Sequence, residues 1–133
     1  MKTKPLPRPT EAELEFLAIL WRLGPSTVRQ IHDALDSKTT GYTTTLKILQ
    51  RMAEKGLVLR NEDDRSHVYR AACRAEQTQG QLVRDLLHRA FAGSPAKLVL
   101  QALSDQNASP EDLAEIRAIL DDLQSRQTKR KSP

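Results

Sequence analysis

The 133-residue chain carries 21 Lys and Arg residues against 17 Asp and Glu residues, for a formal net charge of +4. Hydrophobic residues make up 38% of the chain and aromatic residues only 4%, which argues against a large independent core and favours one completed by oligomerisation. No apolar run approaches the roughly 20 residues of a membrane span, so we expect no direct membrane insertion.

Catalytic, metal and disulfide chemistry find no support in the residue pattern. The chain has a single cysteine, Cys73, and its three histidines are far apart, so neither a disulfide framework nor a metal site is expected. No nucleophile-base pair, phosphate loop or paired-carboxylate motif occurs. The first residues, MKTKPLPRPTEAE, lack the apolar stretch of a secretory signal. We therefore expect a cytoplasmic protein that is not an enzyme and holds no cofactor.

The net charge is distributed unevenly along the chain. Residues 1–73 carry 12 basic and 9 acidic side chains, residues 74–125 carry 5 and 8, and residues 126–133 carry 4 and 0. The five basic residues from Lys38 to Arg60 are opposed by one acid, Glu54. This pattern indicates a basic head that meets a polyanion and an acidic body, although charge alone is equally consistent with a solvated helix face.

Two helices are predicted near the N-terminus. Thr10 and Glu13 form a capping-box sequence, and the apolar residues that follow predict a helix over about 11–23. Ser26 is the expected N-cap of a short second helix. Apolar residues at i, i+3 and i+7 from Val28 give that helix one buried face.

A third helix and a hairpin complete the expected head. The helix is predicted over about 42–55 and is closed by Gly56. Two short alternating segments, at 57–60 and 67–71, flank a polar turn and predict a β-hairpin. Three helices followed by a hairpin are typical of a winged helix-turn-helix DNA-binding domain, which we assign to residues 1–73.

Three more amphipathic helices are predicted after residue 74, and two of them begin at Ser-Pro pairs. Helices of this size cannot cover their own apolar stripes, so we interpret 74–125 as a helical dimerisation domain rather than a small bundle packed against the head. The residues expected at the dimer interface are Leu82, Leu86, Phe91, Leu98, Leu103, Leu113, Ile116 and Leu120. The chain is thus predicted to be mainly α with a small β-hairpin wing, ending in a disordered basic tail at 126–133.

The third helix has a surface suited to a major groove. On a helical wheel, its core side consists of Thr45, Ile48, Leu49 and Met52, and its opposite side is polar and basic. Hydroxyl, methyl and ammonium groups can read base edges, chiefly from the N-terminal part of such a helix. The expected base contacts are Thr43, Thr44 and Lys47. The expected contacts to the DNA backbone are Lys38, Tyr42, Arg51, Arg65 and His67.

Several stretches together carry a family resemblance that covers nearly the whole chain. They are the segment from ELE at 13–15 to LW at 20–21, GYTTTL at 41–46, RMAEKGLV at 51–58, residues 94–103 and EIRAIL at 115–120. In combination they resemble the penicillinase-repressor (BlaI/MecI-type) transcriptional regulators. The resemblance implies a homodimeric repressor with a winged-helix head, which binds a palindromic operator of double-stranded DNA and controls β-lactam resistance or related stress genes.

The resemblance also implies a mode of induction. In well-known members, a membrane sensor-protease system causes cleavage of the repressor inside the dimerisation half, at a bond between Asn and Phe. This chain has Gln101-Ala102 at the matching position, which is its possible cleavage bond. A copper-responsive branch carries a C-terminal cysteine cluster, whereas Cys73 is alone here, so copper sensing is not expected.

Two other functions are consistent with a winged helix. A ligand-sensing regulator of another winged-helix family would need a pocket. With so few aromatic residues, the sequence shows no cluster that would line one. A winged-helix module for protein-protein contact would need a polar or acidic third-helix surface, and this one is basic.

Overall fold

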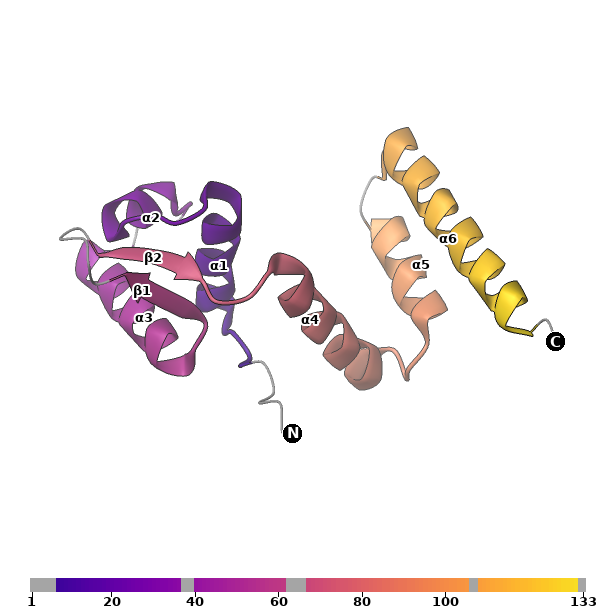
Figure 1. The fold of residues 1–133 in the computed structure, drawn as a ribbon, viewed down its shortest axis with the longest axis horizontal. Helices are drawn as coiled ribbons and strands as arrows, with labels where there is room; N and C mark the ends of the chain where they lie inside the picture. Colours follow the sequence, from indigo (N-terminus) through magenta and orange to yellow (C-terminus); the bar gives the residue numbers. More distant parts are fainter. Residues whose placement is uncertain (1–6, 37–39, 62–66, 106–107, 132–133) are drawn as a thin grey trace. The chain divides into compact units, whose positions relative to one another are not determined.

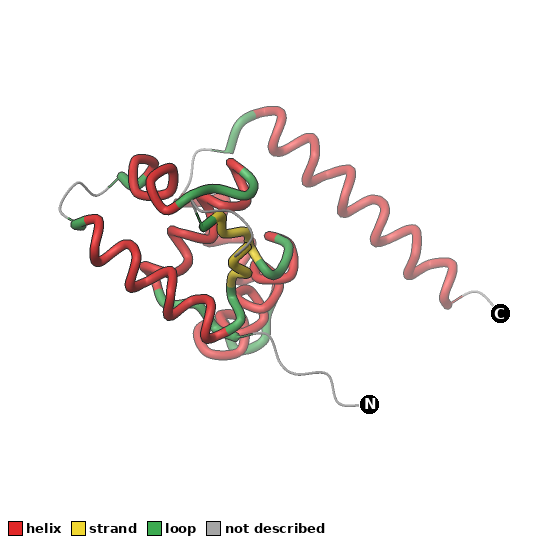
Figure 2. Tube along the Cα trace, turned by 60° about the vertical axis from the view of Figure 1, so that its left-hand side comes forward, coloured by secondary structure: helices red, strands yellow, loops and turns green. Residues whose placement is uncertain are grey.

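The computed structural model describes residues 7–36, 40–61, 67–105 and 108–131. Within them lie six helices and one antiparallel hairpin, so the chain is mainly α with a small β wing, as predicted (Figure 1). Figure 2 shows the same elements along the Cα trace. The chain forms two compact units, residues 1–85 and 86–133. The first therefore extends past the expected boundary at residue 73.

Helix α1 (Glu11–Leu23) begins where the capping-box sequence predicts. The Thr10 backbone N–H donates to Glu13 Oε1 at 2.9 Å, and the Glu13 backbone N–H donates to Thr10 Oγ1 at 3.2 Å. These two bonds satisfy N–H groups that a helix start otherwise leaves unpaired. Phe16, Leu17 and Leu20 then enter the core on one face.

Helix α2 (Val28–Ala34) starts one residue later than predicted, because Ser26 has another role. The cap is Thr27, which exchanges hydrogen bonds with Gln30 in a second capping box. Ser26 is buried and pairs with Tyr69 through two backbone hydrogen bonds of 2.9 and 2.8 Å. The segment before α2 thereby extends the hairpin by one bridge and joins it to the helices.

Helix α3 (Tyr42–Lys55) and the hairpin close the core of the head. The helix ends at Gly56, whose φ of 86° and ψ of 15° are left-handed values that favour glycine. Strands β1 (Val58–Asn61) and β2 (Val68–Ala71) pair with Arg60 opposite Tyr69. The buried hydrophobic residues are Phe16, Leu17, Ile19, Leu20, Val28, Ile31, Leu35, Leu49, Met52, Leu57, Val58 and Tyr69.

An ion pair between the buried Glu13 and the more exposed Lys55 joins the start of α1 to the end of α3. Lys55 Nζ lies 2.6 Å from Glu13 Oε1 and also donates to the Arg8 carbonyl at 3.2 Å. Burial alone would raise the pKa of Glu13, but hydrogen bonds from Lys55 and Thr10 to its carboxylate outweigh burial and lower the pKa below its ordinary value of 4.5. The ionised carboxylate is therefore part of the folded head.

This pair should make the stability of the head depend on pH. Since the pKa of Glu13 is lower in the folded than in the unfolded state, its stabilising effect is present above the unfolded pKa of 4.5 and is lost as pH falls through the folded pKa. Denaturant unfolding of the full chain should show a steeper loss of stability below pH 4.5 for wild type than for Glu13→Gln. Glu11→Gln, which changes an exposed acid in the same turn, is the control and should keep the wild-type profile.

The partner residue gives an independent check at neutral pH. Lys55→Met should lower the free energy of unfolding by about 1–3 kcal/mol, because the Glu13 carboxylate, 3% exposed, loses its cation while it stays buried. An unchanged free energy of unfolding in Lys55→Met, or an equally steep pH profile in Glu13→Gln, would contradict this role for the pair.

The remaining helices are α4 (Ala75–Ala90), α5 (Pro95–Asp105) and α6 (Pro110–Lys131). Ser94 and Ser109 cap the last two helices, because their hydroxyl oxygens accept hydrogen bonds from the backbone N–H groups of Lys97 and Asp112. Beyond Thr78, none of the described residues is buried. The C-terminal unit, residues 86–133, therefore has no core of its own in the single chain.

The predicted disordered tail is wrong for residues 126–131, which continue α6. Arg126 pairs with Asp122 at 3.1 Å, and Thr128 Oγ1 donates to the Gln124 carbonyl at 3.0 Å. Arg, Lys and Gln are good helix formers, and cations are favoured at a helix C-terminus by the helix dipole. The segment lacks apolar side chains and is therefore exposed, but it still continues the helix.

Candidate nucleic-acid interface

The exposed face of α3 carries polar and basic side chains, as the helical wheel predicts. Thr45, Leu49 and Met52 are buried against the core, and Ile48 is half-buried. On the opposite side, the exposed residues are Thr43, Thr44, Lys47, Gln50, Arg51 and Glu54. The structure thus brings the three predicted base-contact residues and Arg51 onto one accessible surface, which we call the α3 face.

The functional groups of the α3 face have no side-chain hydrogen-bond or ion-pair partner among the described residues of the head. Gly41 caps α3 without any side-chain hydrogen bond, so the hydroxyls of Thr43 and Thr44 do not serve as caps. In the described part of the chain, neither threonine, Lys47 nor Arg51 forms a side-chain hydrogen bond or an ion pair. Two hydroxyls and two cations remain available to an external anionic ligand.

Side-chain contacts join helices α2 and α3 beside this face. His32 Nδ1 lies 2.9 Å from Thr45 Oγ1, which also donates to the Gly41 carbonyl at 3.3 Å. The Tyr42 ring meets the edge of the His32 ring at a centroid distance of 5.6 Å, and Arg29 Cζ lies 4.9 Å from the Tyr42 ring centroid. Tyr42, a predicted backbone contact, is therefore 41% exposed but held by two α2 side chains.

In the wing, the cation that sequence reasoning missed is Arg60. Its Nη2 lies 2.7 Å from His67 Nδ1, and its Nε donates to the same atom at 3.2 Å. His67 has a left-handed φ of 52° immediately before β2. The predicted backbone contact His67 thus serves as an acceptor for Arg60. The exposed guanidinium of Arg60 supplies the positive charge. Sequence reasoning could not find this contact, because the pairing of the two strands decides whether Arg60 and His67 meet, and that pairing is not fixed by the residue pattern alone.

Two predicted backbone contacts, Lys38 and Arg65, lie outside the described residues. The cations placed by the structure are therefore Lys47 and Arg51 on α3, Arg29 on α2 and Arg60 on β1. Glu54 lies near the C-terminal end of α3, away from the threonines at its start. The described part of the interface therefore has basic side chains on α2, α3 and β1 and two hydroxyls at the start of α3.

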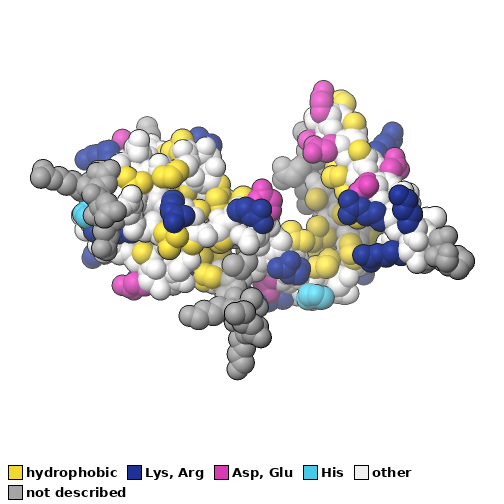
Figure 3. Space-filling view, viewed as in Figure 1, with side chains coloured by type: hydrophobic (Ala, Val, Ile, Leu, Met, Phe, Trp, Pro, Cys, Tyr) yellow, Lys and Arg dark blue, Asp and Glu magenta, His cyan; other side chains and the backbone are white. Residues whose placement is uncertain are grey.

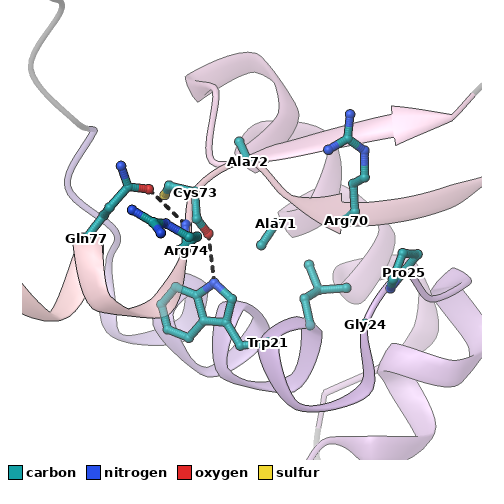
Figure 4. A pocket seen from close by; sticks show the side chains of 10 residues that line it. Trp21, Gly24, Pro25, Arg70, Ala71, Ala72, Cys73, Arg74 and Gln77 are labelled. Atoms are coloured by element: carbon teal, nitrogen blue, oxygen red, sulfur yellow. Dashed lines mark hydrogen bonds between the residues drawn. The ribbon is translucent and has the colours of Figure 1, made fainter.

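A separate open cavity of about 460 Å³ lies between α1 and the end of the hairpin (Figure 4). The Trp21 indole Nε1–H donates to the Cys73 carbonyl at 2.9 Å, and the Arg74 backbone N–H donates to Gln77 Oε1 at 3.0 Å. Trp21 therefore joins the segment after β2 to α1.

The residues predicted to form a dimer interface are all partly or fully accessible in the single chain. Leu82, Phe91, Leu98, Leu103 and Ile116 are half-buried, whereas Leu86, Leu113 and Leu120 are exposed. Helices α5 and α6 jointly line an open cavity of about 250 Å³, to which Leu103 and Ile116 contribute beside Asp112 and Glu115. Figure 3 shows hydrophobic side chains at the surface of these helices.

The possible cleavage bond, Gln101-Ala102, lies in the middle of α5, and both residues are exposed. No helix among the described residues has the length and hydropathy needed to cross a bilayer. The same residues contain no group of three or more His, Cys, Asp or Glu side chains placed to hold a metal ion.

Comparison with known proteins identifies relatives along most of the chain. Residues 9–122 match the family model described as penicillinase repressor. The chain is 36% identical over 121 residues to "Transcriptional regulator BlaI" of Mycobacterium tuberculosis (strain CDC 1551 / Oshkosh), covering 85% of this chain and 88% of that protein. It is 23% identical over 124 residues to "Penicillinase repressor" of Bacillus licheniformis, covering 92% and 97%.

A solved structure also resembles the chain. It is the solution structure of the monomeric form of Bacillus licheniformis BlaI in complex with the blaP half-operator. The match has a TM-score of 0.48 and 22% sequence identity, and it covers 56% of this chain and 93% of that one.

Proposed function

The chain belongs to the penicillinase-repressor family of transcriptional regulators, and on that premise we propose that it is a homodimeric repressor whose α3 enters the major groove of a palindromic operator. The single observation that carries this proposal is the α3 face, where Thr43, Thr44 and Lys47 are exposed and unused within the head.

We assign the groups of the interface by their chemistry. Threonine hydroxyls and the Lys47 ammonium, in the first half of α3, face base edges, because base contacts come chiefly from that part of a recognition helix. Arg51 flanks them and meets a phosphate, with Lys38, Arg65 and His67 as further candidates. The guanidinium of Arg60, held on His67, supplies the charge at the wing.

We propose that residues 86–133, with part of α4, form the dimer interface. Of the eleven large hydrophobic residues exposed in the described chain, eight lie between Val83 and Leu123. Such a surface in a unit without buried residues is what a subunit presents before its partner covers it. Two heads held in this way would reach half-sites about one helical turn of DNA apart, or a multiple of it.

We propose that the operator controls β-lactam resistance or related stress genes and that repression is relieved by cleavage of the dimerisation half, in response to a membrane sensor-protease. The candidate bond is Gln101-Ala102, which is exposed on α5 between residues proposed to hold the dimer together. A gene for such a membrane protease beside this one would support the proposal.

Operator binding can be tested with DNA from upstream of the protein's own gene. We expect a sequence-dependent complex at submicromolar dimer, with affinity falling by about 10³–10⁵ between 50 and 200 mM salt if 6–10 phosphates are contacted. Fluorescence anisotropy with the natural and a scrambled duplex measures both properties. The proposal fails if the two duplexes bind equally at every salt concentration.

A further inference from the structure

The Tyr42 side chain lies between two residues of the preceding helix. Arg29 Cζ is 4.9 Å from the centre of its ring, and the His32 ring meets it edge-on at 5.6 Å with an interplanar angle of 74°. Arg29 and His32 are three residues apart on α2 and so project from the same side of that helix. A tyrosine of α3 thus sits at the junction of two helices, at the first position of the recognition helix.

This arrangement is anchored from the core side. His32 is half-buried, and its Nδ1 lies 2.9 Å from the Oγ1 of Thr45, which is fully buried. Because His32 is tied to α3 through Thr45, it holds one edge of the Tyr42 ring in place. The ring is consequently a fixed platform for the residue on its other side.

Arg29 is the residue on that platform. Its side chain is exposed, and in the described part of the chain it joins no carboxylate in an ion pair. A guanidinium over an aromatic ring keeps the N–H donors at its edge available while its orientation is restricted. The geometry therefore presents an oriented cation, without an ion-pair partner among the described residues, beside the first turn of α3.

We propose that Arg29 is a DNA phosphate contact and that Tyr42 is a positioning residue, which acts through its ring rather than through its hydroxyl. This inference rests on the proposed operator binding by α3. In a helix-turn-helix, the helix before the recognition helix crosses the DNA backbone, and phosphate contacts set the register from which bases are read. Arg29 would fix that register next to Thr43 and Thr44.

The two roles predict different responses to three substitutions. Arg29→Gln removes one phosphate contact per subunit, so the slope of log K against log salt should fall by about 0.9 per subunit, or about 1.8 per dimer. Tyr42→Leu removes the platform and should weaken binding in the same direction, whereas Tyr42→Phe keeps the ring and should bind as wild type. The double variant Arg29→Gln/Tyr42→Leu should be no weaker than Arg29→Gln alone, because both changes affect one contact.

The experiment is anisotropy of the full-length dimer on its operator between about 50 and 200 mM salt. Arg22→Gln, which removes an exposed arginine near the end of α1, is the matched charge control and should keep the wild-type slope. Thermal unfolding monitored by circular dichroism checks that each variant is folded.

Each outcome decides between the possibilities. A wild-type slope in Arg29→Gln overturns the phosphate contact. Equal losses in Tyr42→Phe and Tyr42→Leu overturn the positioning role, because the hydroxyl itself would then touch the DNA. Failure of the wild-type protein to bind any operator refutes the proposed function, which is a different result from operator binding that ignores Arg29.

Discussion

Replacement of Leu120 by aspartate should convert the proposed repressor dimer to monomers and lower its apparent operator affinity by about 10²–10⁴-fold. Leu120 is 53% exposed on α6 in the single chain and lies on the apolar side of that helix with Leu113 and Ile116. A carboxylate buried in the proposed interface without a partner opposes association. Once the heads are separate, the second half-site no longer gains from the first.

The measurement combines sedimentation equilibrium with operator titration. Ala118→Asp is the matched control, because it adds the same charge to an exposed residue on the opposite side of α6 and should leave the dimer intact. Since Leu120 is already exposed in the monomer, the variant should keep its helical content. A dimeric Leu120→Asp protein with wild-type operator affinity would refute the interface.

Alanine at Lys47 or Thr44 should relax the sequence specificity of the repressor. Each side chain is exposed in the first half of α3 and unused within the head, so its loss removes an external contact and leaves the core unchanged. A base contact of this kind accounts for about 1–3 kcal/mol of discrimination at one position, which corresponds to about 5- to 150-fold. The variant should therefore accept substitutions at one operator position in each half-site that the wild type rejects.

Binding to a series of duplexes with single base changes measures this effect. Glu54→Ala, at the far end of the same helix, is the control and should retain the wild-type preference. If Lys47→Ala lost affinity uniformly for every duplex, Lys47 would be a phosphate contact and its assignment to base edges would be wrong.

Local chemistry made most of the head predictable. The capping box at Thr10 and Glu13, the buried side of α3 and the left-handed Gly56 all follow from short-range patterns, and the structure confirms each of them. Ser26 was assigned wrongly because a serine before a helix has the same local preference whether it caps the helix or pairs with a strand. Ser26 pairs with a strand rather than capping the helix because Tyr69, 43 residues later in the chain, lies beside it.

The candidate nucleic-acid interface was also predictable only in part. Periodicity identified the exposed side of α3, because a helix with one buried stripe must turn the rest outward. The contributions of Arg29 and Arg60 were missed, since each depends on a partner from another element: the Tyr42 ring for the first and His67 for the second. In both cases the partner's distance and direction, rather than its place in the sequence, create the site.

By itself, the sequence determined the helices, the hairpin and the outward α3 face, because each depends on neighbouring residues or on a repeated spacing. The family came from the resemblance that its motifs carry in combination. Tertiary structure decided which hydroxyls remain available to DNA. The Thr45 hydroxyl contacts His32 and the Gly41 carbonyl, whereas those of Thr43 and Thr44 have no such partner among the described residues. Tertiary structure also decided that nothing described beyond Thr78 is buried. Hydrogen bonding and burial are properties of positions in space, which residues far apart in the chain share only after folding.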